Sequence, residues 1–211
     1  MLKSNLLKPY LLTFSLLLCA AGAAQADTIY QVSVNTNSLS GTTGSLDFQF
    51  NFGNGETQAA SVTISNLTGG TNGSGTSSGQ VSGGPFPAVV TIGNGYPASG
   101  YNDYFETYTY GRTLNFSLDF SGPAVNAPSG VSTGNSEFYF SMFSDQNGVT
   151  PAPGTDTNGL AGTVVINPNG SSTTTNVSPN LSFSPEPGSL CLTLGAGLLL
   201  GSAAFLRRRA T

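Results

Sequence analysis

Alternation of apolar and polar residues with a period of two is the feature that most constrains the fold of this chain. In residues 46–52, leucine and phenylalanine alternate with Asp47, Gln49 and Asn51. Residues 112–120 repeat the pattern, with apolar residues at every even position from Leu114 to Phe120. Successive side chains of a strand point to opposite faces, so both runs predict strands with one buried face. No segment between residues 27 and 184 has a helical period.

Turn signals separate these runs from further short strand-like runs. Strands are expected within 30–34, 62–64, 89–92, 104–110, 137–143, 160–166 and 173–177. Six Asn-Gly pairs favour tight turns, and Gly111 predicts a hairpin between 104–110 and 112–120. The stretch from Thr68 to Gly84, rich in Gly, Ser and Thr, predicts a long surface loop. The pattern predicts an all-β, antiparallel, jelly-roll-like β-sandwich over residues 27–178, followed by a linker over 179–184.

Composition limits the catalytic and binding chemistry that residues 27–184 can perform. The chain has no histidine, and its two cysteines, Cys19 and Cys191, lie in apolar segments near the two ends. Between residues 27 and 184 there are nine acidic residues and one base, Arg112. An acidic body with a single cation cannot follow a phosphate backbone, so we expect no nucleic acid partner.

Residues 1–26 have the parts of a secretory signal peptide. Lys3 and Lys8 precede a leucine-rich apolar run, and Ala24-Gln25-Ala26 matches the small-residue cleavage pattern of signal peptidase. We therefore expect an N-terminal signal helix and a mature chain that begins at Asp27.

The C-terminus, residues 185–209, has three parts in a fixed order. Pro185-Glu186-Pro187 is a stiff segment that, by its prolines, is expected to join no sheet or helix. Residues 189–206 form an uncharged run that would span about 27 Å as a helix, close to the thickness of a bilayer core. Arg207, Arg208 and Arg209 then fit a stop at the cytoplasmic face. A GPI signal is the nearest rival, but it needs a polar spacer and an apolar end. Here the apolar run follows the proline motif almost directly, and arginines follow the run.

This order resembles the sorting signal of PEP-CTERM proteins, the substrates attributed to bacterial exosortases. The body also resembles a subgroup of PEP-CTERM ectodomains in the runs 46–51, 102–105 and 121–124. The resemblance implies an exosortase partner, an intermediate held in the inner membrane by the C-terminal helix, and processing near Pro185–Pro187. It also implies final display at the cell surface or release outside the cell. An uncut tail that keeps the protein at the inner membrane is the alternative.

Five tyrosines crowd residues 96–110 and suggest a glycan-binding surface. Tyr104, Glu106, Tyr108 and Tyr110 are expected on one face of a strand. Exposed aromatic rings beside a carboxylate suit sugar rings, which stack on the ring face and hydrogen-bond at the rim. The competing interpretation places these tyrosines at the boundary of the core.

Other patterns carry weaker functional hypotheses. Asp145 with Asn147 and Asp156 with Asn158 each place two oxygen ligands before a glycine, as in a calcium loop, although ordinary turns explain both. Residues 75–79 match the G-x-S-x-G elbow by letters, but a Ser-His-Asp triad needs a histidine. Asp103 and Glu106, three residues apart on a strand, would face opposite ways and make a poor glycosidase pair.

The sequence therefore predicts an exported, non-enzymatic protein with a structural or adhesive role at the cell surface or in the extracellular matrix, without a cofactor beyond a structural calcium ion. The first alternative is a carbohydrate-binding module that uses the region from Tyr96 to Tyr110 and binds an extracellular polysaccharide. The second is a glycan hydrolase with two converging carboxylates.

Overall fold

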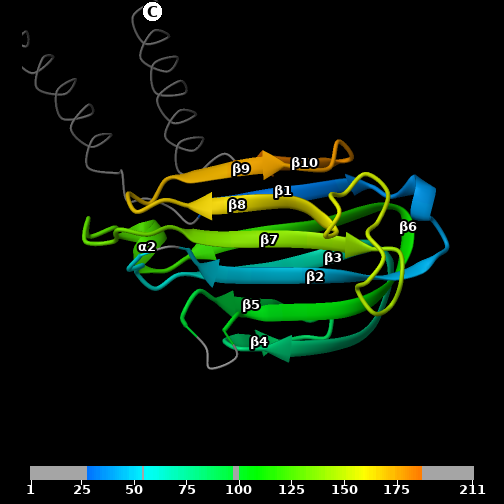
Figure 1. The fold of residues 1–211 in the computed structure, drawn as a ribbon, viewed down its shortest axis with the longest axis horizontal. Coiled ribbons are helices and arrows are strands. Elements are labelled where there is room, and N and C mark those ends of the chain that lie inside the picture. The colour runs from blue at the N-terminus through cyan, green and yellow to red at the C-terminus, as the bar shows by residue number, and fades with distance from the viewer. Residues whose placement is uncertain (1–27, 54, 97–99, 187–211) are drawn as a thin grey trace, which may run out of the picture. The chain divides into compact units, whose positions relative to one another are not determined.

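The computed structural model describes residues 28–53, 55–96 and 100–186, and one compact unit extends from Asp27 to Glu186 (Figure 1). The predicted signal peptide (1–26), Pro187, the predicted span (189–206) and the arginine cluster lie outside the described residues. Within the described residues, no helix has the length and apolar character needed to cross a membrane.

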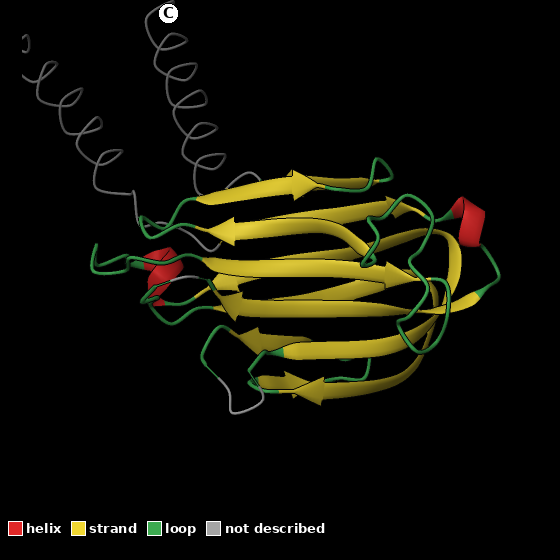
Figure 2. Ribbon diagram, viewed as in Figure 1, coloured by secondary structure: helices red, strands yellow, loops and turns green. Residues whose placement is uncertain are grey.

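The described chain is all-β and antiparallel, as predicted (Figure 2). Its strands are β1 (Thr28–Asn35), β2 (Thr43–Phe52), β3 (Ser61–Ser78), β4 (Val81–Gly83), β5 (Val90–Gly93), β6 (Asp103–Ser121), β7 (Ser136–Phe143), β8 (Leu160–Ile166), β9 (Ser172–Asn176) and β10 (Leu181–Pro185). Two short helices, η1 (Asn37–Leu39) and α2 (Pro123–Asn126), lie in connections. All ten strands belong to one sheet with the order β4-β5-β3-β6-β2-β7-β8-β9, and β1 joins β6 to β10.

Strand β6 organises this sheet because its two halves have different partners. Its first half pairs with β2 (Gln49 opposite Asp103), and its second half pairs with β1 (Val32 opposite Phe116). The hairpin predicted at Gly111 is therefore wrong, since Gly111 lies inside one long strand. A Cβ atom on Gly111 would lie 2.0 Å from the carbonyl oxygen of Gly69, so a close approach of β3, and not a turn, requires glycine here.

The sheet folds over an apolar interior rich in phenylalanine. Phe48 on β2 contacts Phe116 on the second half of β6, with ring centroids 5.5 Å apart, although these segments are not hydrogen-bonded neighbours. The ring centroid of Phe140 on β7 lies 4.9 Å from that of the same Phe116, and the ring centroids of Phe138 and Phe120 lie 5.8 Å apart. The two alternating runs thus bury the faces that the sequence predicted.

The surface loop predicted over 68–84 is wrong, because most of it is the second half of β3. This half pairs with β6, with Asn72 opposite Tyr108 and Ser77 opposite Tyr104. A Cβ on Gly75 would lie 2.2 Å from the Tyr104 hydroxyl, and one on Gly70 would lie 2.6 Å from the Tyr108 ring. The glycines that suggested a loop instead leave room for tyrosine rings to cross the strand.

The linker predicted over 179–184 is also wrong, because it contains most of β10. Leu181 is buried there, and the Phe183 ring lies 6.1 Å from the Tyr30 ring of β1. Glu186 donates its backbone N–H to the Ile29 carbonyl at 2.9 Å, so Pro185, opposite Tyr30, occupies a non-hydrogen-bonded position of the ladder. A proline costs no ladder bond at such a position, which explains how the first residues of Pro185–Pro187 join a sheet against expectation.

Candidate functional site

The tyrosine row lies on one face of β6, as predicted, but that face points into the core. Tyr104, Tyr108 and Tyr110 are 1–3% exposed, and Glu106 is fully buried. The expectation of an exposed aromatic row at these four residues is therefore wrong, and the core placement is what the structure shows. The rings pack against segments distant in the sequence: the Tyr104 ring contacts Phe86, and the Tyr108 and Tyr110 rings lie against glycines of β3 and β2.

The buried polar atoms of this row are mostly paired with each other and with backbone. Tyr104 donates its hydroxyl hydrogen to the Glu106 carboxylate, which also accepts the Phe86 N–H at 3.1 Å. The Tyr110 hydroxyl lies 2.8 Å from the Ser45 carbonyl oxygen and 3.0 Å from that of Phe143. Within the described residues, Glu106 Oε1 and the Tyr108 hydroxyl have no hydrogen-bond partner.

Burial controls the protonation of this cluster. It raises the pKa of the Glu106 carboxyl above its usual range, and the hydrogen bonds from Tyr104 and Phe86 oppose that rise. Burial also raises the pKa of Tyr108 to about 12, with a further contribution from the charge of Glu106. Burial therefore favours the protonated form of Glu106 relative to an exposed glutamate.

The two segments that resemble calcium loops in the sequence are closed by their own aspartates. The Asp145 carboxylate accepts the backbone N–H groups of Asn147, at 2.8 Å, Val149 and Thr150. Hydrogen bonding, chiefly from Thr150, lowers the pKa of Asp145. Asp156 likewise accepts the backbone N–H of Asn158 and of Leu160, each at 2.8 Å. Both segments are turns capped by a carboxylate, and the described residues contain no group of three or more metal-ligating side chains.

Asp103 and Glu106 point to opposite faces, as predicted, and Asp103 meets Asp47 instead. Burial, followed by the hydrogen bond and the charge of Asp47, raises the pKa of Asp103 to about 8. Both carboxylates lie on the outer face of the sheet, on the neighbouring strands β2 and β6. Ser77 of the G-x-S-x-G match lies near the end of β3, opposite Tyr104, and not in a strand-to-helix turn.

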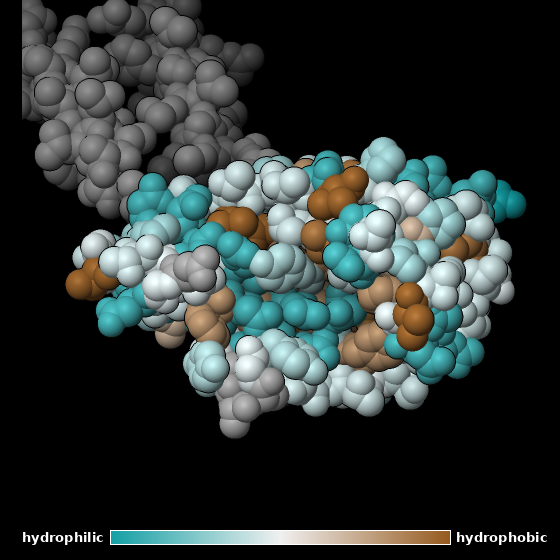
Figure 3. All heavy atoms as spheres, in the orientation of Figure 1, coloured by the Kyte–Doolittle hydropathy of each residue, from teal (hydrophilic) through white to brown (hydrophobic). Residues whose placement is uncertain are grey.

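Asp47 also lines a shallow polar hollow over β2 and β7, where hydrophilic residues gather on the surface (Figure 3). The hollow has a volume of about 270 Å³ and is lined by Asp47, Gln49, Tyr139, Ser141, Asp156, Asn158 and Leu160. Several of its polar groups bond to neighbours: Gln49 donates to Asp47 at 2.9 Å, and Tyr139 donates to Glu137. These polar groups therefore form hydrogen bonds with each other along the strand surface.

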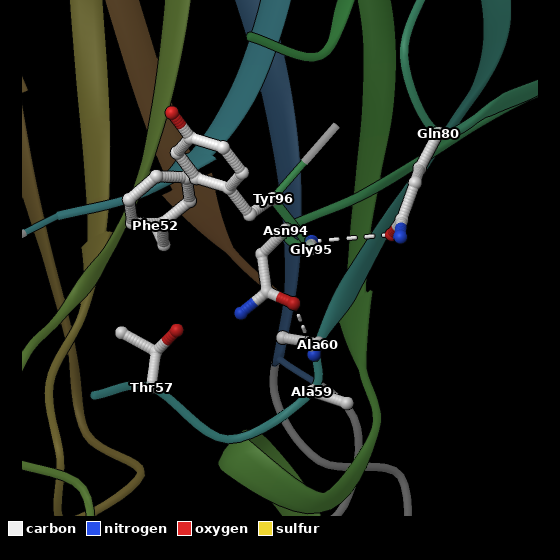
Figure 4. Close-up of a pocket in the computed structure, with 8 residues that line it drawn as sticks. All are labelled: Phe52, Thr57, Ala59, Ala60, Gln80, Asn94, Gly95 and Tyr96. Carbon is white, nitrogen blue, oxygen red and sulfur yellow. Dashed lines mark hydrogen bonds between the residues drawn. The ribbon is translucent and has the colours of Figure 1, made fainter. Parts of the chain in front are cut away.

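A second hollow lies at the other end of β2 and contains an exposed aromatic side chain (Figure 4). We call it the Tyr96 hollow; its volume is about 420 Å³, and it is lined by Phe52, Thr57, Ala59, Ala60, Gln80, Asn94, Gly95 and Tyr96. Tyr96 is 74% exposed, and its ring centroid lies 4.9 Å from that of Phe52 at an interplanar angle of 49°. None of the eight residues is charged.

The floor of the Tyr96 hollow is held by a buried asparagine. Asn94 is 3% exposed and accepts the Ala60 N–H at 2.8 Å. Its amide nitrogen donates to the Gln58 carbonyl at 2.8 Å and to the Ser136 hydroxyl at 2.7 Å. This residue ties the start of β3, the end of β5 and the start of β7 together, so the floor is rigid.

Comparison of the chain with protein-family models, with curated proteins and with solved structures finds no match.

Two features of this surface are missing from the sequence prediction. The Asp47–Asp103 contact depends on the register of β2 against β6, which no motif reveals. The Tyr96 hollow joins residues from four separate segments. Its only signal in the sequence is Tyr96 beside an Asn-Gly pair, and the sequence places that tyrosine in the same cluster as the buried ones.

Proposed function

We propose that this chain is a non-enzymatic protein that is exported, sorted by an exosortase-type system, and used structurally or adhesively at the cell surface or in the extracellular matrix. The observation that carries the proposal is the extent of the compact unit, Asp27 to Glu186. Its bounds coincide with the expected signal-peptidase site after Ala26 and with the motif Pro185-Glu186-Pro187. A body bounded by two processing points fits a protein whose mature form is the body alone.

The pairing of β1 with β10 supports this proposal. Ile29 and Glu186 are hydrogen-bonded partners, and Gln31 donates its side-chain amide to the Glu186 carboxylate. The two ends of the body are therefore fastened to each other by contacts within the described residues. Removal of both segments would leave this fastening in place.

The fold-back of the sheet supports a jelly-roll-like sandwich as the architecture of the body. In this proposal, β2 and β7 to β9 form one layer, and β1, β10, β4 and β5 form the other, while β3 and β6 pass between them. The ring contacts of Phe116 with Phe48 and Phe140 connect the two layers. A phenylalanine-filled core of this kind suits a matrix component that lacks disulfides in its body.

Carbohydrate binding is the second candidate function, and it now rests on a different site. The buried tyrosine row cannot meet a glycan, whereas Tyr96 presents its ring at the surface. This candidate is compatible with an adhesive role, because adhesion to a matrix polysaccharide needs such a contact.

The experiment that tests the proposed function is the intact mass of the protein recovered from the medium and the cell envelope of its native host. We expect a chain that starts at Asp27 and ends near Pro187. A chain that retains Arg207–Arg209 in both fractions would overturn the sorting proposal and make the tail a membrane anchor.

A further inference from the structure

We propose that the Tyr96 hollow is a binding site for an uncharged saccharide, with the Tyr96 ring as its stacking platform. The proposal takes its biological sense from the adhesive role proposed above, but its physical argument is independent of export and sorting. It rests on an exposed ring, neutral hydrogen-bonding groups, a rigid floor and the charge of the surroundings.

The aromatic ring of Tyr96 is available to a ligand. A tyrosine that is 74% exposed leaves a large apolar surface in water, and Phe52 contacts only part of it. The tilted contact at 4.9 Å restrains the ring without covering both of its faces. A sugar ring presents C–H groups on one face, and stacking them on Tyr96 would remove apolar surface of both partners from water.

Two neutral polar side chains line the same hollow as this ring. Thr57 provides a hydroxyl and Gln80 an amide, from opposite sides of the hollow (Figure 4). Both side chains contain donors and acceptors, which matches sugar hydroxyls that donate and accept in turn. The volume of about 420 Å³ lies within the roughly 300–1,000 Å³ typical of small-ligand sites.

The hollow is preformed, which reduces the entropic cost of binding. Asn94 uses its oxygen and its amide nitrogen to hold three segments of the floor. Gly95 donates its N–H to the Gln80 side-chain oxygen at 3.2 Å and so fixes the wall beside Tyr96. A ligand would meet a backbone that these hydrogen bonds already hold in place.

Charge selects against anionic ligands. None of the residues that line the hollow could neutralise a uronate, phosphate or sulfate group. The body from Asp27 to Glu186 has ten acidic residues and one arginine, so its field repels polyanions. The absence of charge in the lining also leaves a cationic ligand without an ion-pair partner there. The chemistry therefore favours neutral glycans.

The test uses the full chain, solubilised in a polyoxyethylene detergent because a detergent with a sugar headgroup would compete. Binding is measured by calorimetry with neutral hexasaccharides of β-glucan, mannan and dextran, and with oligogalacturonate as the anionic comparison. We expect at least one neutral hexasaccharide to bind and oligogalacturonate not to bind. No binding by any neutral probe, or stronger binding of oligogalacturonate, would overturn the proposal.

Substitutions then locate the site. Tyr96→Ala is expected to weaken binding at least about tenfold, as loss of a central aromatic contact does, while Tyr96→Phe keeps the ring and stays within about twofold of the parent. Tyr101→Ala is the matched control, since Tyr101 is also exposed, at 48%, but does not line the hollow. Equal affinity of Tyr96→Ala and the parent, or equal losses in Tyr96→Ala and Tyr101→Ala, would refute the assignment. Melting curves of all variants check that the fold is intact. If Tyr96→Ala unfolds, Thr57→Val, which removes only a hydroxyl that lines the hollow, decides, and parent-like affinity in it would refute the assignment.

The intact-mass experiment tests the sorting proposal, and the glycan-binding experiment tests the site, so either proposal can fail without the other. A protein that keeps its tail but binds a neutral glycan through Tyr96 would retain the site and lose the sorting proposal. A processed protein that binds no neutral glycan would retain sorting and lose the site.

Discussion

Two carboxylates on the outer face of the sheet make the stability of the body depend on pH. Asp103 on β6 lies against Asp47 on β2, and burial with this neighbour raises its pKa to about 8 from an ordinary value of 3.8. A raised pKa means that the folded state holds the proton more tightly than the unfolded state. The resulting stabilisation is complete below about pH 4 and is lost as the pH rises toward 8.

Asp103→Asn should therefore flatten the fall in stability between pH 5 and pH 8. The wild-type free energy of unfolding is expected to fall over this range, and the variant should lose part of the slope because its amide cannot ionise. Buried Glu106, with its own raised pKa, contributes a slope of the same sign and remains in the variant. Urea unfolding at both pH values measures the effect, with Glu56→Gln at an exposed acid as the control. An unchanged slope in Asp103→Asn would contradict the argument.

At the scale of the element, β3 shows how glycine can serve pairing instead of a turn. Its second half runs beside β6 with shifts in register, and its glycines lie where tyrosine rings of β6 cross. Among the glycines near Tyr104, Gly75 leaves the least room for a side chain. A Cβ atom on Gly75 would lie 2.2 Å from the Tyr104 hydroxyl and 2.8 Å from the ring carbon that bears it. Overpacking of this kind costs about 1–3 kcal/mol.

Gly75→Ala is thus expected to destabilise the body by about 1–3 kcal/mol, mostly through Tyr104. Tyr104→Phe removes the atom nearest to the added methyl group, although it also removes the hydrogen bond to Glu106. The double variant Gly75→Ala/Tyr104→Phe should therefore be more stable than the sum of the two single losses, and chemical denaturation of all four proteins measures this coupling. Strict additivity would mean that the methyl group does not meet Tyr104.

The sequence predicts strands better than it predicts their ends and neighbours. The alternating runs identify β2 and the second half of β6 because their inward faces are wholly apolar. Local composition misleads at Gly111, in the second half of β3 and in β10, because at each of these places contact with a distant strand decides the conformation. Glycine and proline are signals of turns only when no partner strand uses them otherwise.

The candidate site shows the same limit. The period of two correctly places Tyr104, Glu106, Tyr108 and Tyr110 on one face, but it cannot say which face is buried. That choice depends on contacts with segments distant in the sequence, such as that of the Tyr104 ring with Phe86. The residues that remain accessible, Tyr96 above all, are outside any periodic run, so only the folded chain reveals them.

At the scale of the whole molecule, the last strand decides where the body ends. The sequence places the end of the domain at residue 178, whereas the structure extends the compact unit to Glu186. Strand β10 contributes the buried Leu181, the contact of Phe183 with Tyr30 and the ladder to β1. Loss of a buried leucine alone costs about 2–5 kcal/mol, and truncation would also uncover the outer edge of β1.

A chain of residues 27–178 should therefore be less stable than one of residues 27–186 by at least about 2 kcal/mol and more prone to aggregate. Urea unfolding and light scattering of the two proteins make the comparison, and a chain of residues 27–180, which keeps the preceding turn but lacks β10, serves as the control. If β10 is the cause, 27–180 behaves like 27–178; if 27–180 matches 27–186, the strand contributes nothing. The expected result bears on processing as well, because a cut upstream of Leu181 would damage the body. A mature protein that is stable outside the cell must then keep β10 and end at or beyond Pro185, which is where the motif lies.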